Sequence, residues 1–311
     1  MAGYVLGIDS GGTHYRVLAA DEQGRQLGIY SGKSASHYYL PKDEMLKNIN
    51  HNIDQCLAVF GGHRKDCLYL VCGTTGLDSK EDEEILMDVY GKLDGFTCPV
   101  CVINDAELAH HTVTGGVGAL VISGTGSIAF GRNGRGETAR AGGWMFSIMG
   151  EEGSGSWISR MALRHLGRWL DGVVEKTPLA ALVSAETGVT SHKQLMDLAV
   201  KIATPPWDEP KLGGIVDQAA AQGDPYAKEL ITRAANEIFN LVSSLITKLG
   251  LDNDPSFKIG IWGSNIVNSS MHQEIFTGLV RRRYPNGTVV LPKRSAAEGA
   301  ADIALERLNR V

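Results

Sequence analysis

The sequence lacks the long apolar runs and basic clusters that mark several classes of protein. No apolar stretch approaches the roughly 20 residues that a membrane-spanning helix needs, and the opening residues MAGYVLG carry no basic segment of a secretory signal. We therefore expect a cytoplasmic protein without a membrane partner. The block of like charge at Arg281, Arg282 and Arg283 fits the last turn of a helix, where cations offset the helix dipole. Nothing in the charge pattern indicates a nucleic-acid partner.

Cysteine is also scarce, and its number is odd. Cys98 and Cys101 have the C-x-x-C spacing of metal or redox sites. No second pair accompanies them, and Cys101 opens the apolar run CVI. We therefore predict buried structural thiols rather than disulfides or a metal site at the five cysteines, Cys56, Cys67, Cys72, Cys98 and Cys101.

The sequence is rich in glycine. The chain is also long for a single hydrophobic core. Its 311 residues include 38 glycines, 43% are hydrophobic and 21% are charged, with a formal net charge of −5. This length predicts two domains. We place the first at residues 1–115 and the second, with extra helices, at 116–311, and the C-terminal helix at about 295–311 as an element able to pack back on the first domain.

Apolar periodicity predicts alternating strands and helices. In the first domain the expected strands are 4–8, 15–20, 27–31, 67–72 and 100–103, and the expected helices are 43–60 and 79–92. Further along, the pattern predicts a strand in 257–262, a long helix begun by Asp224 and Pro225, and a terminal helix capped by Ser295 and Glu298. This alternation is typical of an α/β fold with a mixed sheet in each half.

Two segments repeat the same order of strand, glycine turn, strand, turn and strand. IDSGGTHYRVLAADEQGRQLG begins at Ile8 and VISGTGSIAFGRNGRGETAR begins at Val121, a spacing of just over 110 residues. A repeat of this kind indicates a duplicated supersecondary unit. A cleft between two such halves is a natural ligand site.

The turn in each repeat has the composition of a phosphate-binding loop. Backbone N–H groups in such a turn point one way, and glycine has no Cβ to block a phosphate oxygen. Either turn alone also fits a plain hairpin. Two of them in equivalent places favour a pair of polyphosphate clamps, with Asp9 placed to hold Mg²⁺ through water. The residues concerned are Gly11, Gly12 and Thr13 in the first turn and Gly124, Thr125 and Gly126 in the second.

The successive motifs resemble a known family. GIDSGGTHYRVL, VINDAELA, LVISGTGSIAFG, GGWMFSIMGEEGSGSWI, QGDPYAKELI and GIWGSN are similar, in this order, to those of the BadF/BadG/BcrA/BcrD-type ATPases. This family is the branch of the actin/hexokinase/Hsp70 superfamily that holds N-acetylglucosamine kinases. The resemblance implies two actin-like (ribonuclease H-like) domains with mixed five-stranded sheets flanked by helices. It also implies ATP, Mg²⁺ and substrate in the interdomain cleft.

The resemblance carries roles to individual positions. Asp105 matches the catalytic aspartate, which accepts the proton of the attacking hydroxyl, although an aspartate at the start of a helix also fits a plain N-cap. We expect the helix N-terminus to keep the carboxylate of Asp105 ionised, with a low pKa. The implied nucleotide side, beyond the two turns, is Gly223, Gly263, Ser264 and Asn268. The implied sugar side, beyond Asp105, is Ser36, His37, Gly143, Trp144 and Glu151.

Three positions depart from the family pattern. Glu151 stands where the family usually has an aspartate that binds sugar hydroxyls, and Ser36 stands where it often has asparagine. His14 occupies the place of a lysine or arginine that can reach toward phosphate. The departures leave open whether the pocket takes the same sugar and whether His14 contacts the nucleotide.

These observations predict an ATP-dependent kinase, expected to be a homodimer. It would transfer the γ-phosphate to a hydroxyl, expected at C6, of an amino sugar such as N-acetylglucosamine or glucosamine. A kinase for another sugar such as N-acetylmuramic acid is an alternative. An ATPase activator of a dehydratase or reductase is another, but it needs cysteines for an iron–sulfur cluster in an arrangement that the sequence does not show. A sugar-sensing repressor would carry a DNA-binding domain, which we do not expect here.

Overall fold

The computed structural model describes residues 3–12, 14–144, 150–204 and 208–309. The chain divides into two compact units, the first formed by Met1–Gly116 together with Pro292–Val311 and the second by Val117–Leu291. Within the described ranges no helix is both long and apolar enough to cross a membrane.

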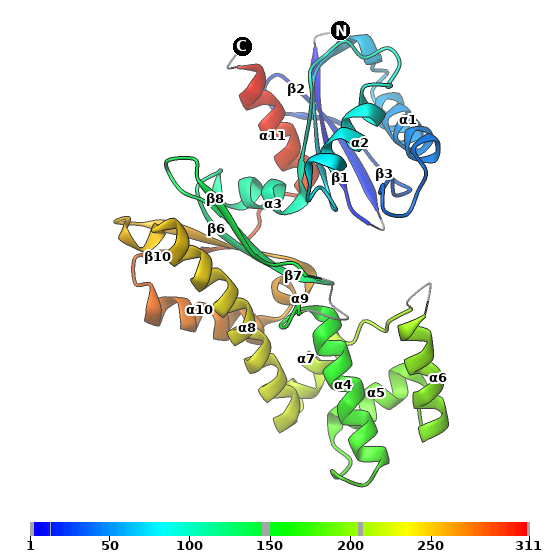
Figure 1. Cartoon of the computed structure of the whole chain (residues 1–311), viewed down its shortest axis with the longest axis vertical. Coiled ribbons are helices and arrows are strands. Elements are labelled where there is room, and N and C mark those ends of the chain that lie inside the picture. Colours follow the sequence, from blue (N-terminus) through cyan, green and yellow to red (C-terminus); the bar gives the residue numbers. More distant parts are fainter. Residues whose placement is uncertain (1–2, 13, 145–149, 205–207, 310–311) are drawn as a thin grey trace. The chain divides into compact units, whose positions relative to one another are not determined.

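The first unit is a mixed five-stranded sheet with helices on both faces (Figure 1). The strand order is β3-β2-β1-β4-β5, in which β1 pairs antiparallel with β2 and parallel with β4. Leu6 and Ile8 of β1 face a core shared with α1 and α2, whereas Gly7 between them faces α11. The bounds are β1 Tyr4–Ser10, β2 Tyr15–Asp21, β3 Gln26–Gly32, α1 Lys42–Ala58, β4 Cys67–Thr74, α2 Lys80–Tyr90, β5 Val100–Asn104, α3 Asp105–Thr114 and α11 Ala296–Leu308.

The second unit repeats this sheet. Its order is β10-β9-β6-β7-β8, with β6 antiparallel to β7 and parallel to β9, so β6 corresponds to β1. The predicted repeat and α/β fold are therefore confirmed. The strand β10 was not predicted. The bounds are β6 Gly118–Ser123, β7 Ser127–Arg132, β8 Thr138–Gly142, β9 Phe257–Trp262 and β10 Gly287–Val290.

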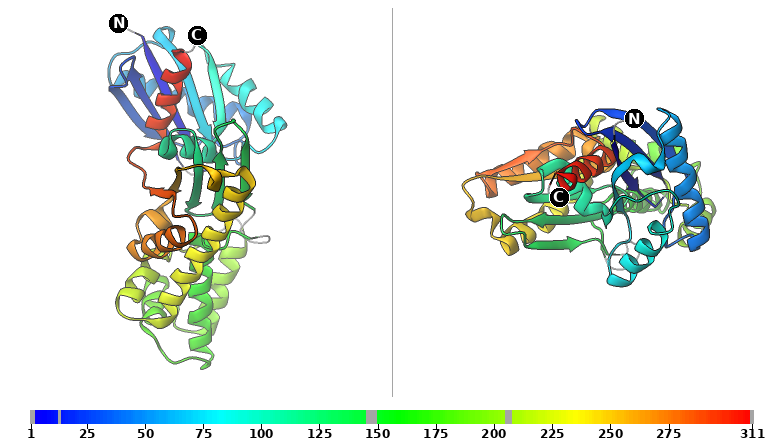
Figure 2. Two further views of the ribbon diagram at one scale, coloured as in Figure 1. Left: turned by 90° about the vertical axis from the view of Figure 1, so that its left-hand side faces the viewer. Right: turned by 90° about the horizontal axis from the view of Figure 1, so that it is seen from above.

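Helices of the second unit form two groups. The long helix α8 runs from a helical cluster onto the sheet, where it packs with α10 (Figure 2). The cluster has its own apolar core, built from α4, α5, α7 and the first half of α8. The bounds are α4 Gly155–Leu170, α5 Pro178–Thr187, α6 His192–Ala203, α7 Gly213–Ala221, α8 Pro225–Leu249, α9 Ser264–Val267 and α10 Ser270–Arg283.

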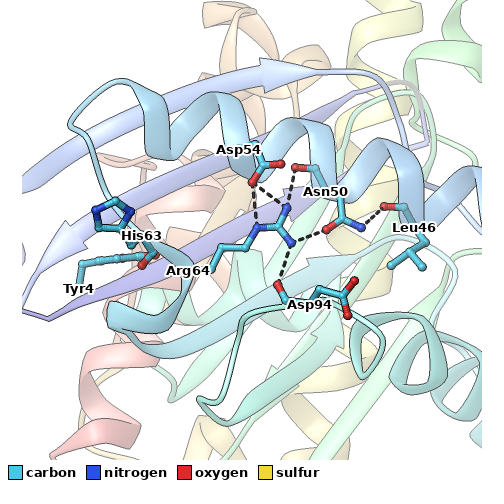
Figure 3. Close-up of polar contacts among 7 residues, drawn as sticks. All are labelled: Tyr4, Leu46, Asn50, Asp54, His63, Arg64 and Asp94. Carbon is cyan, nitrogen blue, oxygen red and sulfur yellow. Dashed lines mark hydrogen bonds and ion pairs between the residues drawn. The ribbon is translucent and has the colours of Figure 1, made fainter.

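A polar network around Arg64 fixes one end of the first unit (Figure 3). Its guanidinium donates to Asp54 of α1 (2.7 Å), to the Asn50 side chain (2.6 Å) and to the Asp94 carbonyl (2.9 Å). Nearby, the Tyr4 hydroxyl donates to the His63 carbonyl. Tyr4 begins β1, so this network lies at the opposite end of the strand from Ser10, about 20 Å away at ~3.3 Å per residue. It joins α1 to the loop before β5 and belongs to the scaffold.

The contact between β1 and α11 yields the first prediction. A Cβ on Gly7 would collide with the backbone of Ala297 and Ala301. Because backbone atoms cannot rotate away, Gly7→Ala should lower the free energy of unfolding by about 2–3 kcal/mol, as overpacking does. Urea unfolding monitored by circular dichroism measures this. The control is Gly134→Ala, because a Cβ there meets nothing within 4 Å. Equal stability of the two variants would contradict the assigned contact.

Candidate active site at two glycine turns

Three parallel strands of the first unit end at one edge of the sheet. Ser10 of β1 pairs with Thr74 of β4, which pairs with Asn104 of β5. The Thr75 N–H also donates to the Ser10 carbonyl at 3.0 Å. This register brings Asp9 and Asp105, which are 96 positions apart in the sequence, to the same edge. Both predicted acidic residues of this unit therefore lie in one place.

Asp105 is the first residue of α3 and is not its cap. The Asn104 side chain caps the helix, accepting from the Ala106 N–H at 2.9 Å, and donates to the Leu77 carbonyl. The N-cap alternative for Asp105 is therefore wrong, because the neighbouring amide takes that place.

The environment of Asp105 also differs from expectation. Burial raises the pKa of Asp105 to about 6, assisted by the negative charges of Asp9 and Asp78, although the Ala106 N–H favours the charged form. The expected low pKa is wrong because loss of water outweighs the favourable helix N-terminus. A carboxylate with this pKa is still ionised at neutral pH and is a stronger base than an ordinary aspartate.

The first glycine turn holds a histidine beside Asp9. His14 Nε2 lies 3.3 Å from Asp9 Oδ2, and this hydrogen bond raises the pKa of His14 against the effect of burial. The imidazole covers Gly11, where a Cβ would lie 2.5 Å from His14 Cε1. Gly12 faces the ring of Tyr39. The predicted Thr13 lies outside the described residues.

The loop after β3 is anchored against this turn. The Ser34 hydroxyl donates to the Gly11 carbonyl at 3.0 Å, and the Asn48 side chain donates to the Ser34 carbonyl. Ser36 is fully buried, and its hydroxyl has no hydrogen-bond partner among the residues described. His37 Nε2 lies 3.1 Å from Asp82 Oδ1. These two predicted sugar-side residues thus lie in a loop that contacts the turn, with one unsatisfied hydroxyl.

The second glycine turn is held by the start of α4. Gly124 N–H bonds the Gly126 carbonyl within the turn, and the Gly155 and Ser156 N–H groups donate to the carbonyls of Gly124 and Thr125. The turn carbonyls are therefore satisfied by the helix, and Thr125 stands exposed at the tip. This leaves a threonine hydroxyl and glycine backbone accessible to an anion.

Gly263 approaches the second turn closely. Its φ is +94°, and a Cβ there would collide with the Ser123 carbonyl, so only glycine fits. Ser264 is the first residue of α9, and Asn268 is its C-cap. The sequence prediction missed Asn265, whose amide donates to the Ser123 hydroxyl at 2.9 Å. The motif GIWGSN contained this residue, but nothing in its spacing showed which polar atom it would meet.

Gly223 lies elsewhere in the second unit. It adopts φ +92° between α7 and the Asp224 cap of α8. Gly213 at the start of α7 is the residue that approaches Asn265, so Gly223 is separated from that contact by the length of α7, about 13 Å at 1.5 Å per residue. The structure gives Gly223 the role of a left-handed turn before a helix.

Glu151 contacts the second turn from the predicted sugar side. Its carboxyl oxygens lie 2.8 and 2.9 Å from the position of a Cβ on Gly126. Burial raises the pKa of Glu151 to about 7, assisted by Glu152 and opposed by Arg160. Among the described non-glycine residues it alone has a positive φ, +68°, a conformation that costs about 1 kcal/mol or more. Such strain is often found at functional sites.

Gly143 and Trp144 precede the same region. Gly143 has φ +73° and its N–H donates to the Ser127 carbonyl, next to the second turn. Trp144 is 57% exposed and, with Glu151, lines a cavity of about 230 Å³. The structure therefore brings the predicted sugar-side residues of this unit to the neighbourhood of the turn.

Among the residues that the structure describes, no three His, Cys, Asp or Glu side chains gather as a metal site. The five cysteines are free thiols, and Cys56, Cys67 and Cys72 are buried. Cys98 hydrogen-bonds with Cys67, which raises the pKa of the Cys67 thiol and lowers that of Cys98. Cys98 of the C-x-x-C pair therefore lies next to Cys67, the first residue of β4.

Several known proteins are similar to this chain. An N-acetylmuramic acid/N-acetylglucosamine kinase from Clostridium acetobutylicum is 31% identical over 307 residues, covering 97% of this chain and 98% of that protein. An N-acetyl-D-glucosamine kinase from Dictyostelium discoideum is 27% identical, covering 96% and 97%. A Chromobacterium violaceum structure, named for a proposed N-acetylglucosamine kinase activity, superimposes with a TM-score of 0.78 at 22% identity, covering 98% and 99%.

Fold similarity extends to a glucokinase of the ROK family from Streptomyces griseus in complex with glucose and AMPPNP. Its TM-score is 0.55 at 17% identity, with 98% of this chain and 100% of that chain covered. The family profile of the BadF/BadG/BcrA/BcrD ATPases matches residues 6–304, nearly the whole chain. The duplicated sheets, the two glycine turns and this match agree, and the chain belongs to the BadF/BadG/BcrA/BcrD ATPase family.

Proposed function

We propose that this protein is an ATP-dependent kinase that phosphorylates a hydroxyl, expected at C6, of an amino sugar of the N-acetylglucosamine class. The observation that carries the proposal is the partly buried carboxyl of Asp105, with its pKa of about 6, beside Asp9 and the first glycine turn. Support comes from the relative in Clostridium acetobutylicum, which is named for N-acetylmuramic acid and N-acetylglucosamine. N-acetylmuramic acid is therefore the second candidate substrate.

The glycine turns are the proposed phosphate-binding elements. Backbone N–H groups of Gly11, Gly12 and Gly126 and the hydroxyls of Thr13 and Thr125 are the candidate donors to phosphate oxygens. Gly263, Ser264 and Asn268 are the proposed nucleotide contacts next to the second turn, and Gly223 is the weaker candidate because α7 separates it from Asn265. His14 adds a donor near Asp9 that is cationic below its raised pKa.

Asp9 is the proposed holder of Mg²⁺. Its side chain is 16% exposed and, among the residues that the structure describes, contacts His14 through Oδ2, so Oδ1 is the candidate acceptor for a metal-bound water. Mg²⁺ keeps several waters and needs only one or two protein carboxylates, so this residue fits. When bound with ATP, the ion would neutralise phosphate charge.

The proposal also includes a cytoplasmic homodimer, since a dimer is the commonest assembly.

Asp105 is the proposed base. It would orient the sugar hydroxyl and accept its proton as the oxygen attacks the γ-phosphorus. Phosphoryl transfer has a loose transition state, so the proton leaves late and orientation contributes much of the effect. Because a carboxylate with a raised pKa is a stronger base, proton acceptance by Asp105 would contribute more to the rate than it would with an ordinary aspartate.

The sugar side is proposed from both units. Ser36 has an unsatisfied hydroxyl, His37 is positioned by Asp82, and Trp144 offers an exposed ring for stacking. Glu151, with its pKa of about 7, is partly protonated at neutral pH and can both donate to and accept from a sugar hydroxyl. Gly143 completes the set of proposed contacts.

A coupled assay of ADP release tests the proposed function. With ATP and Mg²⁺, the panel is N-acetylglucosamine, glucosamine, N-acetylmuramic acid, N-acetylmannosamine and glucose. We expect sugar-dependent turnover with at least one amino sugar, and mass spectrometry should show one added phosphate on it. ADP release that is unchanged by every sugar would overturn the proposal and favour an ATPase.

The role of Asp105 is tested separately. Asp105→Asn keeps the size of the side chain and removes its basicity, so kcat should fall at least about 100-fold while ATP affinity stays within a few-fold. The matched control is Asp94→Asn, at an exposed position on the Arg64 side of the unit. Turnover of Asp105→Asn near that of the control would exclude Asp105 as the base.

A further inference from the structure

A second concave site lies in the helical cluster, away from both glycine turns. It is a groove of about 580 Å³ between α4, the segment after it and the first three turns of α8. Three arginines, Arg164, Arg168 and Arg233, line it together with one carboxylate, Glu229. All of its lining residues belong to the second unit. We call this feature the arginine groove.

The arginine groove is separate from the second turn. The N–H that contacts that turn belongs to Gly155, the first residue of α4, whereas Arg164 and Arg168 follow nine and thirteen positions later. At 1.5 Å per residue these side chains start about 14–20 Å along the helix. None of the residues assigned to ATP or sugar lines the groove.

The arginines of the groove are not neutralised within the described part of the chain. Arg164 has only a long contact from Nη1 to Met161 Sδ, at 4.0 Å, and Arg233 lies over the ring of Trp157 at 5.3 Å. Arg164 and Arg168 are exposed and share one helix face at the (i, i+4) spacing, where like charges repel. Against one carboxylate, three guanidiniums leave a rim with a net charge of about +2. A dianion would relieve this repulsion.

Beneath the rim the groove has a flat aromatic floor. The buried His165 stacks on Tyr226, with ring centroids 4.2 Å apart and an interplanar angle of 13°. His165 Nε2 lies 2.9 Å from Thr177 Oγ1, and burial lowers the pKa of His165. The imidazole is therefore neutral at pH 7 and contributes a flat surface rather than charge. Asp224 behind it caps two helices through the N–H groups of Leu179 and Ala227, which keeps the floor rigid.

We propose that the arginine groove binds a small phosphomonoester. Guanidinium groups recognise phosphate oxygens in bidentate geometry, and a phosphate dianion matches the net charge of the rim. The volume lies within the 300–1,000 Å³ typical of small-molecule sites, so the ligand carries an organic part as well as phosphate. That part would lie on Tyr226. This assignment holds whether or not the chain is a sugar kinase.

Titration calorimetry with phenyl phosphate tests the proposal. The full chain is first saturated with AMPPNP and N-acetylglucosamine, so that the two glycine turns are occupied. We expect saturable binding with one site per chain, tighter than binding of inorganic phosphate or benzoate. The double variant Arg164→Gln/Arg168→Gln should weaken it at least about tenfold. Tyr226→Ala should reduce the preference for phenyl phosphate over inorganic phosphate.

The matched control is Arg281→Gln/Arg282→Gln, which removes the same charge from exposed positions on α10. This variant should bind phenyl phosphate as the wild type does. Three results would overturn the proposal: no saturable binding, undiminished binding by the Arg164/Arg168 variant, or equal weakening in the control, which would indicate a general charge effect. Circular dichroism of each variant confirms folding, and exposed Arg→Gln changes are expected to preserve it.

Discussion

The desolvation of the Asp105 carboxyl group is the interaction on which the candidate site depends. The carboxyl group of Asp105 lies near the negative charges of Asp9 and Asp78, at the edge where β1, β4 and β5 end. The loss of water, assisted by these two charges, raises the pKa of Asp105 to about 6. This pKa suits the proposed role of Asp105 as a base, and the neighbouring carboxyl groups favour a cation at this edge. His14 beside Asp9 is one candidate, and a metal ion with ATP is the proposed second.

The duplicated sheet places a similar turn in each unit, and the two turns differ in the side chains that lie against them. In each unit the turn follows the first strand of a hairpin, and one glycine of the turn lies close to a polar side chain. The first turn is covered by an imidazole, His14, whereas the second faces the carboxyl of Glu151, whose pKa is raised to about 7. The first turn thus lies beside a histidine whose pKa is raised by Asp9, and the second lies beside an acid that is partly protonated at neutral pH.

The sequence was sufficient for the repeat because apolar strands and glycine turns recur with the same spacing. It missed β10, whose four residues carry too little periodicity to be recognised. It offered Asp105 as a possible cap of α3, whereas the preceding Asn104, which also has a capping side chain, takes that place. The pKa of Asp105 and the strain at Glu151 depend on neighbours far apart in the chain. The arginine groove likewise appears only when α8 packs beside α4.

The pH dependence of kcat tests most directly whether Asp105, with its raised pKa, is the base. The base must be ionised, so kcat at saturating ATP, Mg²⁺ and sugar should fall as the pH drops through about 6. ATP also titrates in this range, and Asp78→Asn separates the two effects. Loss of the negative charge of Asp78 lowers the pKa of Asp105, so the acidic limb should move to lower pH in this variant. The account would be contradicted if kcat fell at the same pH in the wild type and in Asp78→Asn, or if kcat of the wild type did not fall above pH 5.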